Sequence, residues 1–396
     1  MRKIVGERPK TSGNSVRGAR GFSRELVLVV CFLSLIALLG ATAFVSRMYH
    51  KRVHTLADQW FEQGETDYNA GDAKKALIDY RNALVFSPSN KVFQFHLASA
   101  LAANGQLPEA RAYLLPLLSD SPGSGEINLA LARIAAHQSK MQDAMLYYNS
   151  AIYGEWPDQP IEMRWNVRRE LCEFLLSRGA SSQAEPALVA LADNTPDDDI
   201  DKQKAAGKLL LAGQLWNRAL DEYRSVLAKN RNDADALEGA GTAAYNLGYY
   251  SQAVNFLGRL PRDRSADPKI STLLETSRLV EASDPFLEGL SIRDKARRTV
   301  DALNVAETRA HACMGAGSAS SPAGAPHSEL GDLLATAQQA GTDWSVTNLI
   351  REPDRINTAM DLVFRIENAA EGPCGEPTGE DRALWLIGRS VGNNHP

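Results

Sequence analysis

Hydrophobic and small residues return along most of this chain at a fixed interval. Alanine recurs at six positions spaced by 34, 34, 40, 35 and 34 residues, namely Ala76, Ala110, Ala144, Ala184, Ala219 and Ala253. A second small residue stands twelve positions before each alanine, and a larger residue, Tyr or Leu, stands four positions after it. The apolar spacing between these columns is that of amphipathic helices. This pattern predicts stacked helix-turn-helix repeats, which form an all-α solenoid.

Numbering each repeat so that the periodic alanine is position 20 gives six predicted repeats. They span residues 57–90, 91–124, 125–158, 165–198, 200–233 and 234–267. Small residues at positions 8 and 20 let the two helices of a repeat approach closely, and the residue at position 24 fills the space beside them. At position 32, Pro88, Pro122 and Pro196 cannot continue a helix and therefore set the turn into the next repeat.

The array resembles tetratricopeptide repeats, whose usual pattern has Trp at position 4, a small residue at 8, Gly at 15, Ala at 20 and Pro at 32. The first repeat follows that pattern with Trp60, Gly64, Gly71, Ala76 and Pro88. The third repeat departs from it at Trp156 and Pro157, and Arg231 and Ser265 replace the proline in repeats five and six. The resemblance implies a solenoid that binds protein or peptide partners along its concave groove.

An uncharged stretch near the N-terminus is long enough to cross a bilayer. Residues 26–45 reach roughly 30 Å as a helix at about 1.5 Å per residue, and we predict a transmembrane helix over 26–46. Seven Lys or Arg precede it and three follow it closely. This bias places the basic, disordered tail of residues 1–25 in the cytoplasm and the repeats in the periplasm of a bacterium. The predicted protein is thus a single-pass inner-membrane protein.

Two other topologies compete with this one. A cleaved signal peptide would release the repeats into the periplasm after cleavage near Ala43, because Ala41, Thr42 and Ala43 fit the small-residue cleavage rule. The long basic tail and the apolar continuation through Phe44 and Val45 argue against cleavage. An anchored domain that faces the cytosol conflicts with the charge bias.

The charge of the chain excludes one class of partner. Of its 43 Lys or Arg and 48 Asp or Glu, ten basic and two acidic side chains lie in residues 1–54. The remainder therefore carries 33 basic and 46 acidic side chains, a formal charge of −13. An acidic surface does not neutralise phosphates, so we expect no nucleic-acid partner.

After residue 267 the alanine interval stops, although helical patterning continues. We predict that residues 268–396 form a helical module that caps the last repeat, with a flexible linker at 315–327. Cys313 and Cys374 lie in this module and would pair in an oxidising compartment; the alternative is two unrelated thiols. His311 stands beside Cys313, but without further ligands it does not make a metal site.

The first helix of each tetratricopeptide repeat commonly lines the groove through positions 2, 5, 9, 12 and 13. Applied to this chain, the resemblance yields an aromatic end followed by a basic middle. An acidic or carboxylate-bearing partner segment would suit the basic residues, and its apolar side chains would suit the aromatic ones. The alternative is that all of these are ordinary solvated or packing residues. The candidate groove residues are Phe61, Tyr68, Asn69, Phe95, Arg133, His137, Arg169, Lys204, Lys208, Tyr245 and Asn246.

No motif for catalysis stands out. The sequence contains no glycine-rich phosphate loop, paired-histidine metal motif or nucleophile elbow, so we expect no enzyme, cofactor or metal. The acidic run of Asp197, Asp198, Asp199 and Asp201 is interpreted as a helix N-terminus rather than a calcium loop. The predicted function is a membrane-anchored scaffold for protein–protein interaction in the bacterial envelope, an assembly or accessory factor of a secretion, pilus or polysaccharide machine. The alternative is an enzyme with an unrecognised active site in 268–396.

Overall fold

The computed structural model describes residues 19–317, 326–371 and 374–393. The chain divides into two compact parts, which we call the N-terminal lobe (Met1–Asp158) and the C-terminal lobe (Gln159–Pro396). The regular structure of the described residues is helical, apart from one isolated parallel bridge between Ser124 and Glu155. The expected all-α fold is confirmed.

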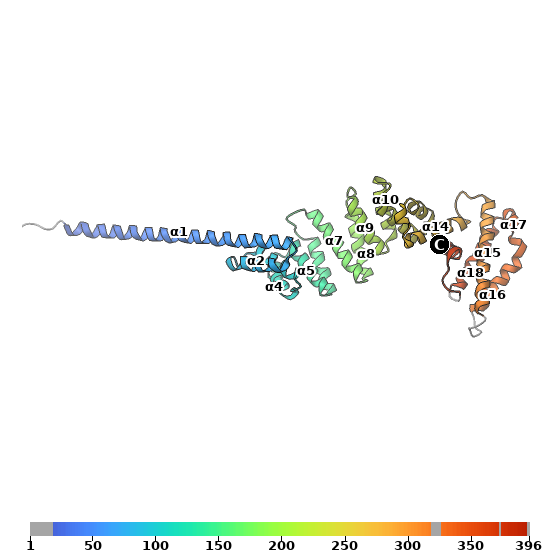
Figure 1. Cartoon of the computed structure of the whole chain (residues 1–396), viewed down its shortest axis with the longest axis horizontal. Helices are drawn as coiled ribbons and strands as arrows, with labels where there is room; N and C mark the ends of the chain where they lie inside the picture. The colour runs from blue at the N-terminus through green and yellow to red at the C-terminus, as the bar shows by residue number, and fades with distance from the viewer. Residues whose placement is uncertain (1–18, 318–325, 372–373, 394–396) are drawn as a thin grey trace, which may run out of the picture. The chain divides into compact units, whose positions relative to one another are not determined.

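The N-terminal lobe contains three pairs of antiparallel helices, of which α1, α2, α4 and α5 are labelled in Figure 1. Each pair supplies the two helices of one predicted repeat and packs on the next pair. The helices are α1 (Ala19–Asn69), α2 (Ala73–Phe86), α3 (Lys91–Ala103), α4 (Leu107–Asp120), α5 (Gly125–His137) and α6 (Met141–Ile152).

The C-terminal lobe continues with three more pairs and then a helical module. The pairs are α7 (Pro160–Ser177) with α8 (Ser181–Asp193), α9 (Ile200–Ala212) with α10 (Trp216–Lys229), and α11 (Ala234–Asn246) with α12 (Tyr250–Leu257). The module contains α13 (Arg262–Ser265), α14 (Pro268–Ser283), α15 (Ile292–Gly317), α16 (Pro326–Ala340), the 3₁₀ helix η1 (Gly341–Trp344), α17 (Val346–Arg351), α18 (Arg355–Ala370) and α19 (Gly379–Asn393).

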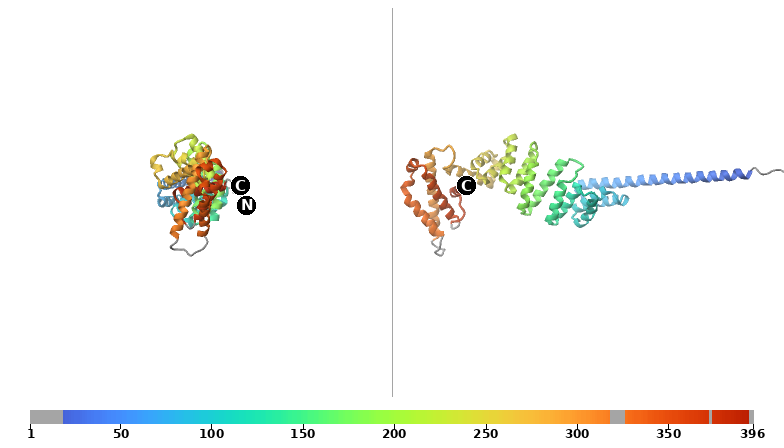
Figure 2. Two further views of the ribbon diagram at one scale, coloured as in Figure 1. Left: turned by 90° about the vertical axis from the view of Figure 1, so that its right-hand side faces the viewer. Right: turned by 180° about the vertical axis from the view of Figure 1, so that it is seen from behind.

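One helix, α1, joins the apolar segment to the first repeat without a break, as Figures 1 and 2 show. The sequence predicts a helix over 26–46 and a separate repeat from residue 57. Residues 46–56 contain neither Gly nor Pro, however, so nothing in the connecting segment ends the helix. The helix also begins at Ala19, inside the predicted disordered tail. Residues 1–18 of that tail lie outside the described part of the chain.

The two columns of small residues lie where the helices of a pair meet. All six periodic alanines are buried, with at most 1% of their surface exposed. A Cβ atom added at Gly64 would lie 2.7 Å from the Tyr80 ring, and one added at Gly241 would lie 2.3 Å from Leu257. These distances are far inside van der Waals contact, so the larger residue at position 24 fills the space that the small residue at position 8 leaves free.

Helix starts and turns follow local signals. Asn90, Ser124, Asp199 and Asp233 accept backbone hydrogen bonds at the N-termini of α3, α5, α9 and α11. The interpretation of the Asp197–Asp199 run as a helix N-terminus is therefore confirmed at Asp199. The turn within each pair places position 15 in the left-handed region. Glycine occupies this position in four repeats, whereas repeats three and five have Ser139 and Gln214 there.

The departure of repeat three from the usual pattern has a structural role. Trp156 is buried and packs so closely on Gly125 that a Cβ atom there would lie 2.3 Å from the indole. Its Nε1 donates a hydrogen bond to the Ala151 carbonyl at 2.9 Å, and the Gly125 N–H donates to the Glu155 carbonyl at 2.9 Å. The segment after α6 therefore folds back onto the start of α5 and closes the N-terminal lobe.

The module after the last repeat covers its final helix. Helix α14 packs against both α12 and α19, and α15, α16, α18 and α19 enclose a shared apolar core that includes Met360, Val363 and Ile387. An apolar face that the last repeat leaves open is thus covered, as a solenoid requires. Of the predicted linker 315–327, residues 318–325 lie outside the described part of the chain, while the flanking residues belong to α15 and α16.

Candidate partner-binding cavities

The N-terminal lobe has a cavity of about 230 Å³ on the side formed by the first helices of its three repeats, which we call the first cavity. Three candidate groove residues line it: half-buried Tyr68 on α1, and exposed Arg133 and His137 on α5. Its apolar wall comes from small and aliphatic side chains. The full lining is Tyr68, Ser99, Ala102, Ala103, Leu107, Ala130, Arg133, Ile134 and His137.

Other candidates in this lobe lie outside the first cavity. Asn69 is exposed at the end of α1, and Phe95 on α3 is half-buried against the apolar core. Phe61 stacks on Phe93, with 4.7 Å between ring centroids, and meets the edge of His96 at 5.0 Å. These ring contacts show that Phe61 packs between helices. Its place at position 5 of the repeat does not predict this packing from the sequence.

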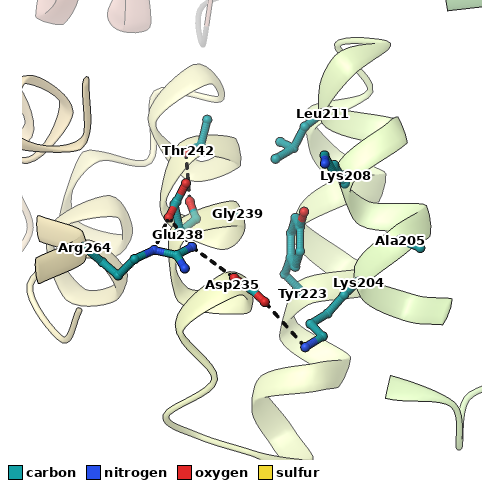
Figure 3. Close-up of a pocket in the computed structure, with 10 residues that line it drawn as sticks. All are labelled: Lys204, Ala205, Lys208, Leu211, Tyr223, Asp235, Glu238, Gly239, Thr242 and Arg264. Carbon is teal, nitrogen blue, oxygen red and sulfur yellow. Dashed lines mark hydrogen bonds and ion pairs between the residues drawn. The ribbon is translucent and has the colours of Figure 1, made fainter. Parts of the chain in front are cut away.

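The C-terminal lobe has a larger cavity of about 420 Å³, which we call the second cavity and which Figure 3 shows in close-up. Two of the candidate residues, Lys204 and Lys208 on α9, line it. The sequence analysis missed the other polar lining residues because they come from second helices or from the next repeat. The full lining is Lys204, Ala205, Lys208, Leu211, Tyr223, Asp235, Glu238, Gly239, Thr242 and Arg264.

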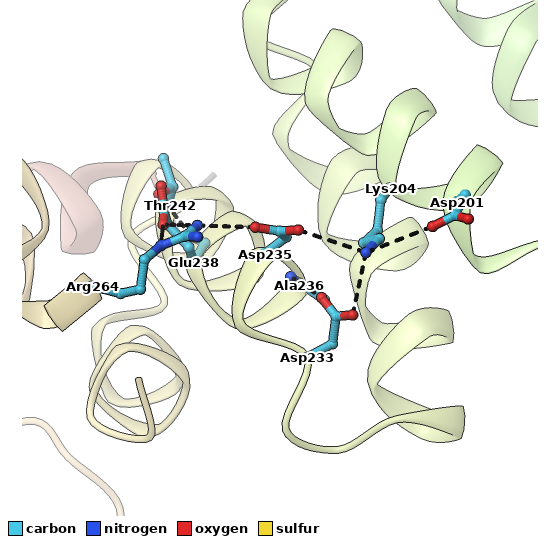
Figure 4. Close-up of polar contacts among 8 residues, drawn as sticks. All are labelled: Asp201, Lys204, Asp233, Asp235, Ala236, Glu238, Thr242 and Arg264. Atoms are coloured by element: carbon cyan, nitrogen blue, oxygen red, sulfur yellow. Dashed lines mark hydrogen bonds and ion pairs between the residues drawn. The ribbon is translucent and has the colours of Figure 1, made fainter. Parts of the chain in front are cut away.

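Lys204 already has acidic partners within the protein. Its Nζ lies 3.4 Å from an oxygen of Asp233, 3.6 Å from Asp235 and 3.8 Å from Asp201, as drawn in Figure 4. Burial lowers the pKa of Lys204, but the three carboxylates outweigh burial, and the net shift is upward. The ammonium group is therefore charged and held within the lobe, and its role in receiving an acidic partner segment stays a prediction.

Arg264 continues the same network from α13. Its guanidinium lies 3.0 Å from Asp235 and 2.7 Å from Glu238. Asp235 thus stands between Lys204 and Arg264, and the chain of alternating charges in Figure 4 links α9, α11 and α13. Both carboxylates in the lining of the second cavity are neutralised by these cations.

The remaining candidates in this lobe line neither cavity. Arg169 pairs with Glu173 one turn along α7, with 2.9 Å between the charged atoms. Tyr245 packs edge-to-face on Tyr250 at 5.6 Å, and the Asn246 amide donates to the Thr242 carbonyl at 2.8 Å. Five of the eleven candidates therefore line a cavity. Tyr68, Arg133 and His137 line the first cavity, and Lys204 and Lys208 line the second.

The module at the C-terminal end contains the cysteine pair and a buried ion pair. A disulfide joins Cys313 on α15 to Cys374, with 5.3 Å between Cα atoms. One turn earlier, Arg309 forms an ion pair with Glu367 of α18 and donates to the Gly375 carbonyl at 2.9 Å. Burial raises the pKa of Glu367 to about 7, although the Arg309 charge opposes this shift.

A third cavity, of about 520 Å³, lies beside these groups. Its lining includes Arg309 together with the carboxylates Glu380 and Asp381, and burial raises the pKa of Asp381. Ionisable groups therefore converge in the module. Among the residues that the structure describes, no group of three or more His, Cys, Asp or Glu side chains is arranged to hold a metal ion.

The helix pairs define the fold as an α-solenoid of helix-turn-helix repeats. A family model for the tetratricopeptide repeat matches residues 95–160. The chain is accordingly a tetratricopeptide repeat protein, a scaffold for protein interaction, with one N-terminal helix that is long and apolar enough to span a membrane. No curated protein matches the chain.

Solved structures resemble the chain over about half its length. PilW, a type IV pilus biogenesis factor, is 17% identical and covers 55% of this chain and 98% of its own, with a TM-score of 0.39. PilF of Pseudomonas aeruginosa is 15% identical and covers 55% and 96%, with a TM-score of 0.40. YrrB, a repeat protein with an unusual peptide-binding site, is 15% identical and covers 48% and 95%, with a TM-score of 0.37. Likeness at this level assigns no partner to the chain.

Proposed function

We propose that this tetratricopeptide repeat protein is anchored in the inner membrane of a bacterium by residues 26–45 and holds protein partners in the periplasm. Its role would be that of an assembly or accessory factor of a secretion, pilus or polysaccharide machine. The observation that carries the anchor is α1, in which a fully exposed apolar segment continues directly into the first repeat. Such a surface is stable only in lipid or against another apolar surface.

Two features support the periplasmic side. The excess of Lys and Arg before the apolar segment favours a cytoplasmic N-terminus. The cysteine pair in the C-terminal module suits an oxidising compartment, because thiols in the cytoplasm are kept reduced. Both features favour the anchor and the cleaved signal peptide alike, so the experiment must separate these two.

Two measurements on the full chain test the anchor and its topology. Alkaline phosphatase fused after Pro396 should be active, and the intact chain should stay in the membrane pellet after carbonate extraction. The control is Ala43→Phe, which blocks cleavage after a small residue and should leave the size of the product unchanged. A soluble product shortened by about 43 residues, restored to full length by Ala43→Phe, would establish the signal peptide instead. An inactive fusion would contradict the periplasmic location.

The second candidate function is an enzyme with its active site in residues 268–396. The third cavity favours it, because Arg309, Glu380 and Asp381 line the same space. However, the Arg309 guanidinium is nearly buried and bound to Glu367 and Gly375, which gives it a structural task. The scaffold therefore remains the function that the residues support best.

A further inference from the structure

Repeats one and five share a packing arrangement but differ in the polar groups beside it, because Glu65 pairs with His96 in the first and Gly239 stands at the position equivalent to His96 in the second. In each, a tyrosine at position 24 packs on a glycine at position 8: Tyr80 on Gly64, and Tyr223 on Gly207. At position 9 the first repeat has Glu65, whose Oε1 accepts a hydrogen bond from the Tyr80 hydroxyl at 2.5 Å. The same position in repeat five is Lys208. The carboxylate that satisfies the first tyrosine is therefore replaced by an ammonium group.

The Tyr223 ring is held firmly at the base of the second cavity. Only 4% of its surface is exposed, and Cβ atoms added at Gly207 or Gly239 would lie 2.8 or 2.2 Å from the ring. Helices α9 and α11 therefore both pack closely against the ring. Among the described residues, its hydroxyl has no hydrogen-bond partner, although it lines the cavity. The hydroxyl therefore faces the cavity as a donor that an acceptor entering the cavity can reach.

Lys208 is the cation of this lining that has no ion pair within the described part of the chain. Its side chain is exposed, whereas Lys204 and Arg264 are bound to Asp235 and Glu238. In Figure 3 the dashed lines reach Lys204 and Arg264 but neither Lys208 nor Tyr223. The ammonium group and the hydroxyl thus remain as two donors that line one cavity without an acceptor.

We propose that the second cavity binds the carboxylate of a glutamate or aspartate side chain from a partner protein, held between Lys208 and Tyr223. The bound carboxylate would occupy the place that Glu65 takes beside Tyr80 in the first repeat. Since Glu65 is a side chain presented by a helix, the occupant is a side-chain carboxylate rather than a chain terminus. The inference rests on the proposed scaffold function and specifies the chemistry of the partner at one subsite.

Charge and surface in the cavity agree with this occupant. Asp235 and Glu238 are neutralised by Lys204 and Arg264, so they repel an incoming carboxylate less than free acids would. Leu211 and Ala205 supply an apolar wall that suits the methylene groups of the acidic side chain. A hydrogen bond from an ammonium group to a carboxylate is about twice as strong as a neutral one.

The test measures binding of two labelled peptides to the purified full-length chain in detergent. One peptide is a run of four glutamates between glycines with both ends blocked, and the other is a glycine-serine peptide with a free C-terminal carboxylate. Fluorescence anisotropy gives the dissociation constants for the original chain, Lys208→Ala and Tyr223→Phe. The matched control is Lys269→Ala, because Lys269 is exposed on α14 and lines neither cavity.

The blocked acidic peptide should bind the original chain, and Lys208→Ala and Tyr223→Phe should each weaken it by about 5- to 50-fold, with Lys269→Ala unchanged. Lys208→Glu should abolish binding while the circular dichroism spectrum and melting temperature are retained, because the new carboxylate can accept from Tyr223 as Glu65 does from Tyr80. Equal binding by all variants, or binding of the free-terminus peptide alone, would overturn the subsite. Neither result bears on the anchor, which fractionation tests separately.

Discussion

At the scale of single residues, small side chains decide how closely two helices pack. The repeating alanines and the small residues at position 8 could be recognised in the sequence because each packs against the same position of the paired helix in every repeat. Ion pairs have no such regularity. Lys204 contacts Asp233 at the end of its own repeat and Asp235 in the following repeat, and nothing in the residue types at those positions indicates the contact. Five of the eleven candidate groove residues line the two cavities, and their role in binding a partner stays a prediction.

Position 15 provides a test of backbone strain. Gln214 holds a φ of 61° in the turn between α9 and α10, where glycine serves in four other repeats. A residue with a side chain in this left-handed backbone conformation costs roughly 1–2 kcal/mol. Replacing it with glycine removes that cost, but the greater flexibility of glycine in the unfolded chain offsets part of the stabilisation. We expect Gln214→Gly to raise the free energy of unfolding by about 0.5–1 kcal/mol in urea titrations. Gly248→Ala, at the same position in repeat six with a φ of 79°, should lower it.

Glu367 makes the stability of the C-terminal module depend on pH. Burial raises its pKa in the folded state to about 7 from an ordinary value of 4.5. Its contribution to stability is then complete below pH 4.5 and is lost as the pH rises through 7. This difference in pKa corresponds to about 3 kcal/mol between pH 4.5 and 8. In urea titrations, Glu367→Gln should remove this part of the pH dependence.

The control for that titration is Glu288→Gln, since Glu288 is exposed between α14 and α15. It should leave the pH dependence of the unfolding free energy as it is in the original chain. If Glu367→Gln and Glu288→Gln behave alike between pH 5 and 8, Glu367 is not the group responsible.

At the scale of helices, the sequence predicts that a helix is present more accurately than it predicts where the helix begins and ends. The helix pairs appear where the 34-residue interval places them, because every pair must bury the same apolar stripe. The junctions depend on local signals that the interval does not contain. Helix α1 runs through the expected break since no Gly or Pro interrupts it, and α7 begins at Pro160, before the predicted start of repeat four. Trp156 takes over the closing role that proline has in other repeats.

The disulfide between α15 and the segment before α19 is the element-scale feature most open to experiment. It joins residues 61 positions apart, and on the chain-entropy model a loop of this size stabilises by about 4 kcal/mol, less any strain. Reductant should lower the melting temperature of the original chain and change its mobility on a nonreducing gel. The Cys313→Ser variant should have the melting temperature of the reduced original chain, whether or not reductant is present. Two unrelated thiols would give no mobility change.

At the scale of the whole molecule, the chain is a repeat scaffold whose first helix is long and apolar enough to span a membrane. The fold class followed from the sequence because a solenoid is specified by local repetition, with few contacts between distant residues. The partner did not follow, since repeats of one architecture bind different partners through different surface side chains. The two cavities narrow the choice of surface positions at which to look for a partner.

The most direct test of the central claim is photocrosslinking in intact cells from inside and outside the cavities. A photoreactive phenylalanine analogue replaces Tyr68 in the first cavity and Leu211 in the second, with Val85 on α2 and Ile161 on α7 as exposed controls. The account predicts that both cavity positions crosslink envelope proteins in the membrane fraction and that the controls do not. Crosslinks of equal yield from all four positions, or none from the cavities, would contradict it.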